Sequence, residues 1–181
     1  SFISEDRMVY DLVREGTIEE NLISDRYYKK EYCRGPLMDK AKMDREAEEL
    51  IRGYLVACDG KGAYMRTLSG GNMQKVITAR ECSSHPKILI ASQPTRGIDV
   101  GATEFIRKRL VELRDQGAAI LLFSADLAEV MELSDSLIVM HGGKIAAYFE
   151  DTSTLTDDVM GEYMLGLKTQ SEEEIRRVCH D

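Results

Sequence analysis

The stretch from residue 88 to residue 123 most constrains the fold of this chain. Two apolar runs, Ile88–Ala91 and Ala118–Phe123, flank a segment, Val100–Gln116, in which apolar side chains recur every three or four residues. The runs have the composition of strands buried on both faces of a parallel sheet, and the segment between them has the pattern of a packed helix. A strand, a helix and a strand within about 35 residues form a parallel crossover unit. The sequence therefore predicts an α/β fold with a parallel sheet and flanking helices.

Other segments carry weaker patterns that extend this fold. Phe2 and Ile3 are typical of the end of a strand, and Thr17 is a candidate N-cap for a short helix. A helix stripe is predicted within Asp44–Val56, on Ala47, Leu50, Ile51, Tyr54 and Leu55. Further on we expect a short helix at Asp126–Leu133, a hairpin of Ser136–Met140 and Lys144–Phe149 about His141–Gly143, and an acidic helical tail at Thr152–His180 with a stripe of Val159, Tyr163 and Leu167.

Composition narrows the classes of function. The 181 residues suffice for one domain with a core, divisible into two subdomains, and no stretch approaches the roughly 20 apolar residues that a membrane helix needs. The net charge of −8 argues against nucleic acid as a partner, because nucleic acid attracts clustered Lys and Arg. The basic, aromatic stretch Tyr27–Met43 is accordingly interpreted as a solvated or protein-contacting face rather than a nucleic-acid patch.

Neither cysteines nor histidines show metal-ligand spacing. The four cysteines are scattered and are expected to be reduced thiols of a cytosolic protein: Cys33, Cys58, Cys82 and Cys179. The three histidines are isolated and are expected at the surface: His85, His141 and His180. No metal site is predicted.

The string Leu68–Lys75 is the strongest candidate for a binding site. Ser69 is followed by Gly70 and Gly71, which let the backbone approach a ligand, and Asn72 and Gln74 lie in the polar run that opens a helix expected to continue to about Ser83. Free N–H groups at such a helix start hold anions, most often phosphate. A flexible turn before a helix is the alternative interpretation. The whole string resembles the LSGGQ signature of ABC-type ATPases, in the LSGGNxQK form of importers of simple sugars and nucleosides.

This resemblance extends from about Phe2 to Leu167. It implies a partial ABC-type P-loop NTPase domain without its Walker A segment, which the family carries upstream of the strand at which this chain starts. By resemblance, residues of about 8–83 form a helical signature subdomain that faces a transmembrane partner. Residues of about 84–150 form a catalytic-core subdomain and residues 151–181 a helical tail. The chain is thus expected to be the carboxyl-terminal part of a two-domain importer ATPase.

The resemblance also assigns positions after the two predicted strands. Ser92 and Gln93 fall where the family carries the Walker B Asp, which orders Mg²⁺, and the catalytic Glu. The run 94–99, here called the D-loop, ends in Asp99, which would meet the facing domain. Ala125 falls at the position of the switch histidine. Serine and glutamine carry no charge and alanine offers no side-chain hydrogen bond, so this site looks disabled for hydrolysis. Near the start of the chain, Ser4 replaces a family proline and Glu5 falls near the Q-loop glutamine.

The expected cofactor is ATP, with Mg²⁺ in the intact transporter. Leu68, Ser69, Gly70, Gly71, Asn72, Gln74 and Asp99 would contact ATP held by the amino-terminal ATPase domain of the same protein. The expected partners beyond that domain are permease subunits and, indirectly, a substrate-binding lipoprotein, at the cytoplasmic face of the membrane. The string 91–102 looks closest to nucleoside importers, with sugar importers as the alternative. The chain alone is expected to be inactive.

Two interpretations from other classes remain. One is a soluble ABC-type ATPase of translation or DNA repair, which should show a basic surface or an inserted coiled coil. The other is a docking or regulatory domain that never touches nucleotide. The missing catalytic groups favour this second alternative, and the intact signature opposes it.

Overall fold

The computed structural model describes residues 1–35, 37–153 and 155–178, and the chain forms two compact units. The first unit runs from Ser1 to Phe123 and contains the predicted crossover, and the second begins at Ser124. In the part of the chain that is described, none of the helices is long and apolar enough to cross a membrane.

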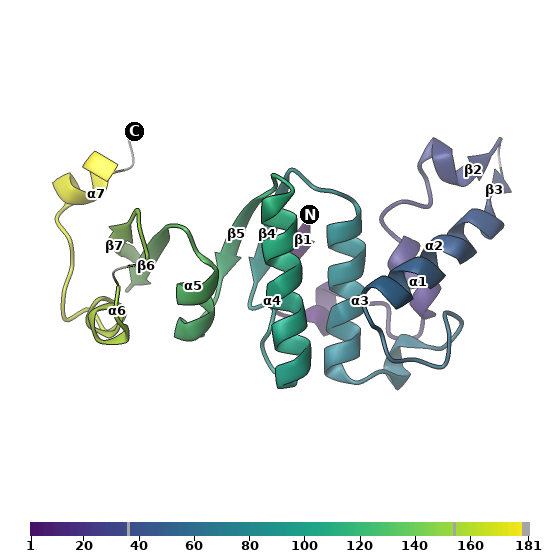
Figure 1. The fold of residues 1–181 in the computed structure, drawn as a ribbon, viewed down its shortest axis with the longest axis horizontal. Helices are drawn as coiled ribbons and strands as arrows, with labels where there is room; N and C mark the ends of the chain where they lie inside the picture. Colours follow the sequence, from purple (N-terminus) through teal and green to yellow (C-terminus); the bar gives the residue numbers. More distant parts are fainter. Residues whose placement is uncertain (36, 154, 179–181) are drawn as a thin grey trace. The chain divides into compact units, whose positions relative to one another are not determined.

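The first unit is built on a parallel sheet. Its strands are β1 (Phe2–Ile3), β4 (Ile88–Ser92) and β5 (Ala119–Phe123), in the order β1-β4-β5 (Figure 1). Phe2 pairs with Ile90 and Ile88 pairs with Ala119, both in parallel register. Helix α4 (Val100–Asp115) joins β4 to β5, and its predicted stripe is buried: Ala102, Ile106, Leu110 and Leu113. The predicted crossover unit is confirmed.

The strands are not buried on both faces, and that part of the prediction is wrong. In β4, Leu89 and Ala91 are buried while Ile88 is 61% exposed, and in β5 both Leu121 and Phe123 are 48% exposed. Burial that alternates along a strand is typical of a sheet with one face packed and the other open. Apolar runs alone do not reveal whether a second layer covers the other face.

Three helices form the helical part of the first unit: α1 (Ile18–Ile23), α2 (Lys40–Gly53) and α3 (Gly70–Ser83). The Thr17 cap of α1 is confirmed as a full capping box with Glu20. Short elements complete this part of the unit: the one-turn helices η1 (Arg7–Asp11), η2 (Lys30–Tyr32) and η3 (Met65–Thr67), and the strand pair β2 (Cys33–Arg34) and β3 (Leu37–Met38).

Helix α2 starts four residues earlier and ends three residues earlier than predicted. It starts at Lys40 because the Asp39 side chain accepts a hydrogen bond from the Lys42 amide, which makes Asp39 the N-cap. It ends at Gly53, so Tyr54 and Leu55 lie beyond the helix, and Leu55 is 63% exposed with a φ of 52°. The predicted stripe therefore extends past the true end of the helix.

A buried arginine ties these helices together. The Arg26 guanidinium, 3% exposed, lies 2.8 Å from a Glu46 carboxylate oxygen on α2 and donates to the Arg80 carbonyl of α3 at 2.7 Å. Asp25 provides a second carboxylate at 2.7 Å. The Tyr32 hydroxyl donates to Glu46 at 2.5 Å, and burial together with Glu46 raises the pKa of Tyr32 to about 12. Because its charge is fully paired, Arg26 fixes α3 against α2.

The second unit contains α5 (Leu127–Leu133), the antiparallel pair β6 (Leu137–His141) and β7 (Lys144–Phe149), α6 (Asp157–Met164) and α7 (Glu172–Val178). The predicted short helix and hairpin are confirmed. Gly142 and Gly143 turn the hairpin with φ of 57° and 76°. Val139, Ala147 and Met160 are buried together as the core of this unit.

The predicted continuous tail is instead two helices, which corrects the expected stripe. Gly166, with a φ of 71°, follows the end of α6, and Leu167 lies outside both helices and is 74% exposed. Gln170 then pairs with the edge of β7, exchanging hydrogen bonds with the Tyr148 backbone through its side-chain amide and donating its own N–H to Ala146. Cys179 and His180 lie outside the described residues.

Candidate functional site

The signature string opens α3 as the sequence predicts. Ser69 is the N-cap, and its hydroxyl oxygen accepts from the Asn72 amide at 3.4 Å and from the Asn72 side chain at 3.0 Å. The Ser69 side chain is exposed, Gly70 is half-buried and Gly71 is buried. The helix ends at Ser83 as expected. Its first N–H groups have no partner four residues back in the helix, so this end of α3 is suited to holding an anion.

Gly71 is required by packing within the chain itself. A Cβ at Gly71 would lie 2.5 Å from the Asp99 Oδ2 atom and 3.0 Å from the Ala102 Cβ atom. Asp99 is the N-cap of α4, with its Oδ1 atom accepting from the Ala102 amide at 2.9 Å. The start of α3 and the start of α4 therefore cross with no room for a side chain. Signature and D-loop, far apart in sequence, form one closely packed surface.

Other residues of the string face inward. Leu68 is buried at 9% exposure, and Gln74 is 1% exposed on the packed side of α3. The Gln74 Oε1 atom is buried without a hydrogen-bond partner. Both polar atoms of the Asn72 side chain already have partners within the chain. Its Oδ1 atom accepts from the Ala57 amide at 2.9 Å, and its Nδ2 atom donates to the Ser69 hydroxyl oxygen. Of the predicted contact residues, Ser69 and Asp99 are exposed, and Gly70 and Asn72 are half-buried.

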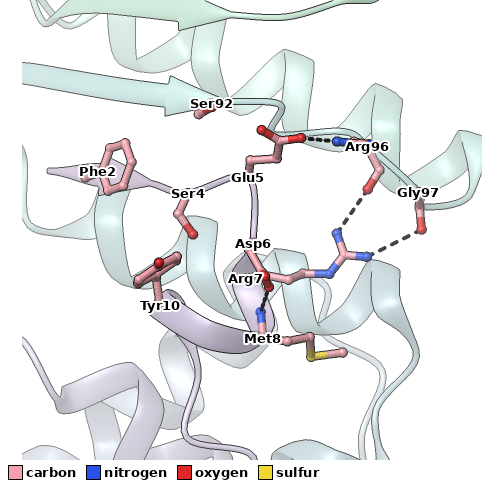
Figure 2. A pocket seen from close by; sticks show the side chains of 10 residues that line it. All are labelled: Phe2, Ser4, Glu5, Asp6, Arg7, Met8, Tyr10, Ser92, Arg96 and Gly97. Carbon is pink, nitrogen blue, oxygen red and sulfur yellow. Dashed lines mark hydrogen bonds and ion pairs between the residues drawn. The ribbon is translucent and has the colours of Figure 1, made fainter.

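An open pocket of about 800 Å³ lies at the carboxyl ends of β1 and β4 (Figure 2). Parallel strands bring their carboxyl ends to one edge, so Ser92 and the segment after Ile3 meet there. The lining residues are Phe2, Ser4, Glu5, Asp6, Arg7, Met8, Tyr10, Ser92, Arg96 and Gly97.

The carboxylates of this pocket already have partners. Glu5 forms an ion pair with Arg96, and the Asp6 Oδ1 atom caps η1 by accepting from the Met8 amide at 3.2 Å. Ser92 contributes a neutral hydroxyl. Across the described ranges, no group of three or more His, Cys, Asp or Glu residues could hold a metal ion. These donors do not fit Mg²⁺, which prefers carboxylate oxygens.

Arg7 is a contact residue that the sequence reasoning did not single out. Its guanidinium donates to the Arg96 carbonyl at 3.1 Å and to the Gly97 carbonyl at 3.5 Å. The same group lies 3.4 Å from where a Cβ of Gly70 would be. Figure 2 shows Glu5 and Arg7 reaching the D-loop from one short segment. The signal in the sequence was the charged run Glu5-Asp6-Arg7 directly after a strand.

The segment that carries these charges is closed by a buried carboxylate. The Asp11 Oδ2 atom accepts from the Ser4 amide at 2.8 Å and from the Ser4 hydroxyl at 2.9 Å. Burial raises the pKa of Asp11, and the two hydrogen bonds from Ser4 oppose that shift. The loop from Ser4 to Asp11 is thus held at both ends.

Gln93 and Ala125 fall in different compact units. Gln93 follows β4 and has a φ of 50°, in the left-handed region that residues other than glycine rarely adopt. Its backbone amide donates to the Phe123 carbonyl at 2.7 Å. Such backbone conformations gather at functional sites. Ala125 is exposed, and its side chain is a methyl group without a hydrogen-bonding atom.

Comparisons with known proteins agree on one group of relatives. No family model matches the chain. The guanosine import ATP-binding protein NupO of Bacillus subtilis (strain 168) is 44% identical over 170 residues, which cover 94% of this chain and 33% of that protein. The nucleoside import ATP-binding protein NupA of Lactococcus lactis is 41% identical, covering 91% and 32%. The ribose import ATP-binding protein RbsA 1 of Streptomyces avermitilis is 41% identical, covering 87% and 30%.

Solved structures show the same fold. A dimeric ATP-binding cassette in a post-hydrolysis state, bound to ADP and phosphate, superposes with a TM-score of 0.65 at 21% identity, covering 85% of this chain and 63% of that one. The ATP-binding subunit of an ABC transporter superposes with a TM-score of 0.63 at 25% identity, covering 99% and 68%. The predicted fold class is confirmed, and the chain spans about a third of the length of the curated relatives it matches.

Proposed function

We propose a function from the premise that this chain belongs to the ABC-type ATP-binding proteins of nucleoside and sugar importers. In the intact protein, Ser69 and the first N–H groups of α3 close on ATP held by the facing amino-terminal ATPase domain. One observation carries the proposal. The Ser69 end of α3 is exposed, while Gly71 is locked against Asp99, so a surface suited to an anion is held rigidly.

The chemistry assigned to this surface is electrostatic. Bound ATP supplies the phosphoryl group that is transferred to water. Ser69 donates its hydroxyl hydrogen, and the amides of Gly70 and Gly71 donate their N–H groups, toward negative charge on the terminal phosphate. Fixed donors aimed at developing charge account for much of phosphoryl-transfer catalysis. Asp99, which already caps α4, holds these donors in place through its contact at Gly71.

The pocket beside Ser92 is proposed to bind nucleotide without turning it over readily. Ser92 and Gln93 offer neither a charge for Mg²⁺ nor a base for water, and both pocket carboxylates are engaged. The methyl side chain of Ala125, at the proposed switch position, has no hydrogen-bonding group. The Mg²⁺ ligand and the base of the competent site are therefore assigned to the amino-terminal domain, and this chain alone should be inactive.

The transported substrate is proposed to be a nucleoside, with a simple sugar as the second candidate. The names of two relatives, NupO at 44% identity and NupA at 41%, refer to guanosine and nucleoside import. Other relatives are a ribose import protein, also at 41% identity, and xylose and glucose import proteins. The proposed partners are permease subunits and a binding lipoprotein, with the protein peripheral to the cytoplasmic face of the membrane. The residues of about 8–83, 84–150 and 151–181 remain the proposed subdomains.

The test is ATP hydrolysis by the intact protein carrying Ser69→Arg. Filling the start of α3 with a cationic side chain should lower ATP turnover by about 100-fold or more. Thr156→Arg is the matched control, because Thr156 caps α6 with a hydrogen bond of the same 3.4 Å length. Turnover in the control should stay near that of the wild type. Normal turnover in Ser69→Arg would overturn the proposal and favour the docking interpretation.

A further inference from the structure

We propose that Glu5 is a positioning residue that fixes the D-loop through Arg96, and that this ion pair sets the activity of the signature surface. The inference rests on the proposed function of that surface. Glu5 lies near the position of the family's Q-loop glutamine. The positioning role proposed here does not require Glu5 to contact a ligand. Two observations carry the inference. One is the ion pair between Glu5 and Arg96, and the other is the tight contact between Asp99 and Gly71.

The segment after β1 holds the D-loop at two points. The Glu5 carboxylate is paired with the Arg96 guanidinium, and Arg7 donates to the carbonyls of Arg96 and Gly97 at 3.1 and 3.5 Å. These partners are separated by about ninety residues in sequence, so each contact closes a long loop. Within the D-loop, the Arg96 amide donates to the Gln93 carbonyl at 3.1 Å. The turn is thereby connected to the carboxyl ends of β1 and β4.

Displacement of this turn would reach the signature directly. Asp99 follows Gly97 by two residues, and its Oδ2 atom occupies the space that a Cβ of Gly71 would need. Arg7 also lies within 3.4 Å of the Cβ position at Gly70. Since packed helix crossings do not deform continuously, a shift of Asp99 must move the start of α3 or the start of α4. The contact path from Glu5 to Ser69 therefore runs through Arg96, Asp99 and Gly71.

The exposure of the pair separates this role from a folding role. The side chains of Arg96 and Glu5 are 65% and 51% exposed. Ion pairs with that exposure contribute little to the stability of a fold. Loss of this pair should accordingly leave the unfolding transition nearly unchanged while it alters ATP turnover.

The experiment is a charge-swap cycle in the intact ATP-binding protein. Glu5→Arg places an arginine beside Arg7 and Arg96, and Arg96→Glu places a glutamate beside Glu5 and Asp6. Because like charges then repel, each single variant should lower kcat for ATP hydrolysis about tenfold while the KM changes less. The double variant Glu5→Arg/Arg96→Glu restores the pairing and should recover kcat to within about threefold of the wild type. Arg114→Glu and Asp115→Arg are matched controls, because that exposed pair of 2.9 Å lies at the far end of α4.

Amide hydrogen exchange gives a second readout that is independent of turnover. In both single variants, the peptide covering residues 92–103 should exchange at least about fivefold faster, because the Arg96 and Ala102 amides depend on the position of the turn. The double variant should regain protection. The two charge controls should leave this peptide unchanged.

The outcomes distinguish the positioning role of Glu5 from the proposed function of the signature surface. If Ser69→Arg abolishes turnover but the single charge variants keep both normal kcat and normal exchange, the positioning role is wrong and the proposed function stands. Failure of the double variant to recover either readout also overturns the positioning role. If Ser69→Arg leaves turnover intact, the proposed function fails, and the exchange data still decide whether Glu5 holds the D-loop.

Discussion

Two neighbouring regions of the first unit obey opposite constraints. At the crossing of α3 and α4, Gly71 and Asp99 meet so closely that a methyl group cannot be added. At the edge where β1 and β4 end, Ser92 lies in an open pocket of about 800 Å³ with neutral or already paired groups. The crossing of α3 and α4 is fixed by steric contact. The chemistry of the pocket is set by its lack of an unpaired carboxylate. A surface that must present donors rigidly needs the first kind of constraint, whereas a pocket that only holds a ligand does not.

The contrast predicts where substitutions are tolerated. A new atom at the crossing must move two helices, while an altered side chain in the pocket changes electrostatics with little repacking. The five changes below are ordered from the largest expected effect to the smallest, and each could break this comparison.

Gly71→Ala should be the most damaging of the five. The added methyl would lie 2.5 Å from Asp99 Oδ2, so the crossing must open, at a cost of about 2 kcal/mol in the free energy of unfolding. Denaturant unfolding followed by far-ultraviolet circular dichroism measures it. Gly53→Ala is the matched control, because Gly53 lies in α2 with nothing within 4 Å of its added Cβ. Equal stability of Gly71→Ala and Gly53→Ala would mean that the crossing is looser than described.

Asp99→Ala should cost about 1 kcal/mol, because the Ala102 amide loses its capping acceptor at 2.9 Å. Ser69→Ala should cost about half as much, since its capping hydrogen bond is longer, at 3.4 Å. The same unfolding measurement compares them. Adding Asp99→Ala to Gly71→Ala should recover part of the lost stability, because it removes the nearest clashing atom. Strict additivity of the two changes would contradict the contact.

Asp11→Asn should change the pH dependence of stability in a defined direction. Burial raises the folded-state pKa of Asp11 above its usual 3.8, so its stabilising contribution is complete below that value and is lost as pH rises through the raised pKa. Between about pH 4 and about pH 7 the wild type should therefore lose stability relative to Asp11→Asn. Unfolding at several pH values tests this, with Asp59→Asn in an exposed loop as control. A difference that grows in the opposite sense would show that the Ser4 hydrogen bonds dominate.

Gln93→Gly should be the mildest change and should stabilise. Relief of the left-handed backbone at φ of 50° outweighs the added freedom of the unfolded chain, for a net gain of about 0.5 kcal/mol. Gln116→Gly, at a residue with φ of −80°, should lower stability by a similar amount. Unfolding measurements on both variants decide the sign. Destabilisation by Gln93→Gly would mean that the glutamine side chain makes contacts worth more than the strain.

Much of the site follows from local sequence, and the remainder depends on distant contacts. The Ser69 cap and the end of α3 at Ser83 were predictable because capping and breaking residues act on their neighbours. The α4 stripe was predictable for the same reason. The start of α2 was not, because Asp39 had no feature that distinguished it as the cap until the helix was seen.

The contacts of Glu5 and Arg7 could not be derived from their neighbours. Both partners, Arg96 and Gly97, lie about ninety residues away, and charged runs after a strand more often face solvent. The exposure of Leu121 and Phe123 was likewise hidden, since it depends on what covers the sheet rather than on the strand itself. The assigned roles of Ser92, Gln93 and Ala125 stay predictions.

The pairing of Gln170 with β7 bears on intermolecular strand pairing at the edge of the second unit's hairpin. An open strand edge offers unpaired N–H and C=O groups on which another chain can add a strand. Here the Tyr148 N–H and carbonyl are both taken by one glutamine side chain, and the Ala146 carbonyl by the Gln170 backbone. A single residue therefore caps the edge as a short strand would. Along this part of β7, Gln170 takes the place of a further strand.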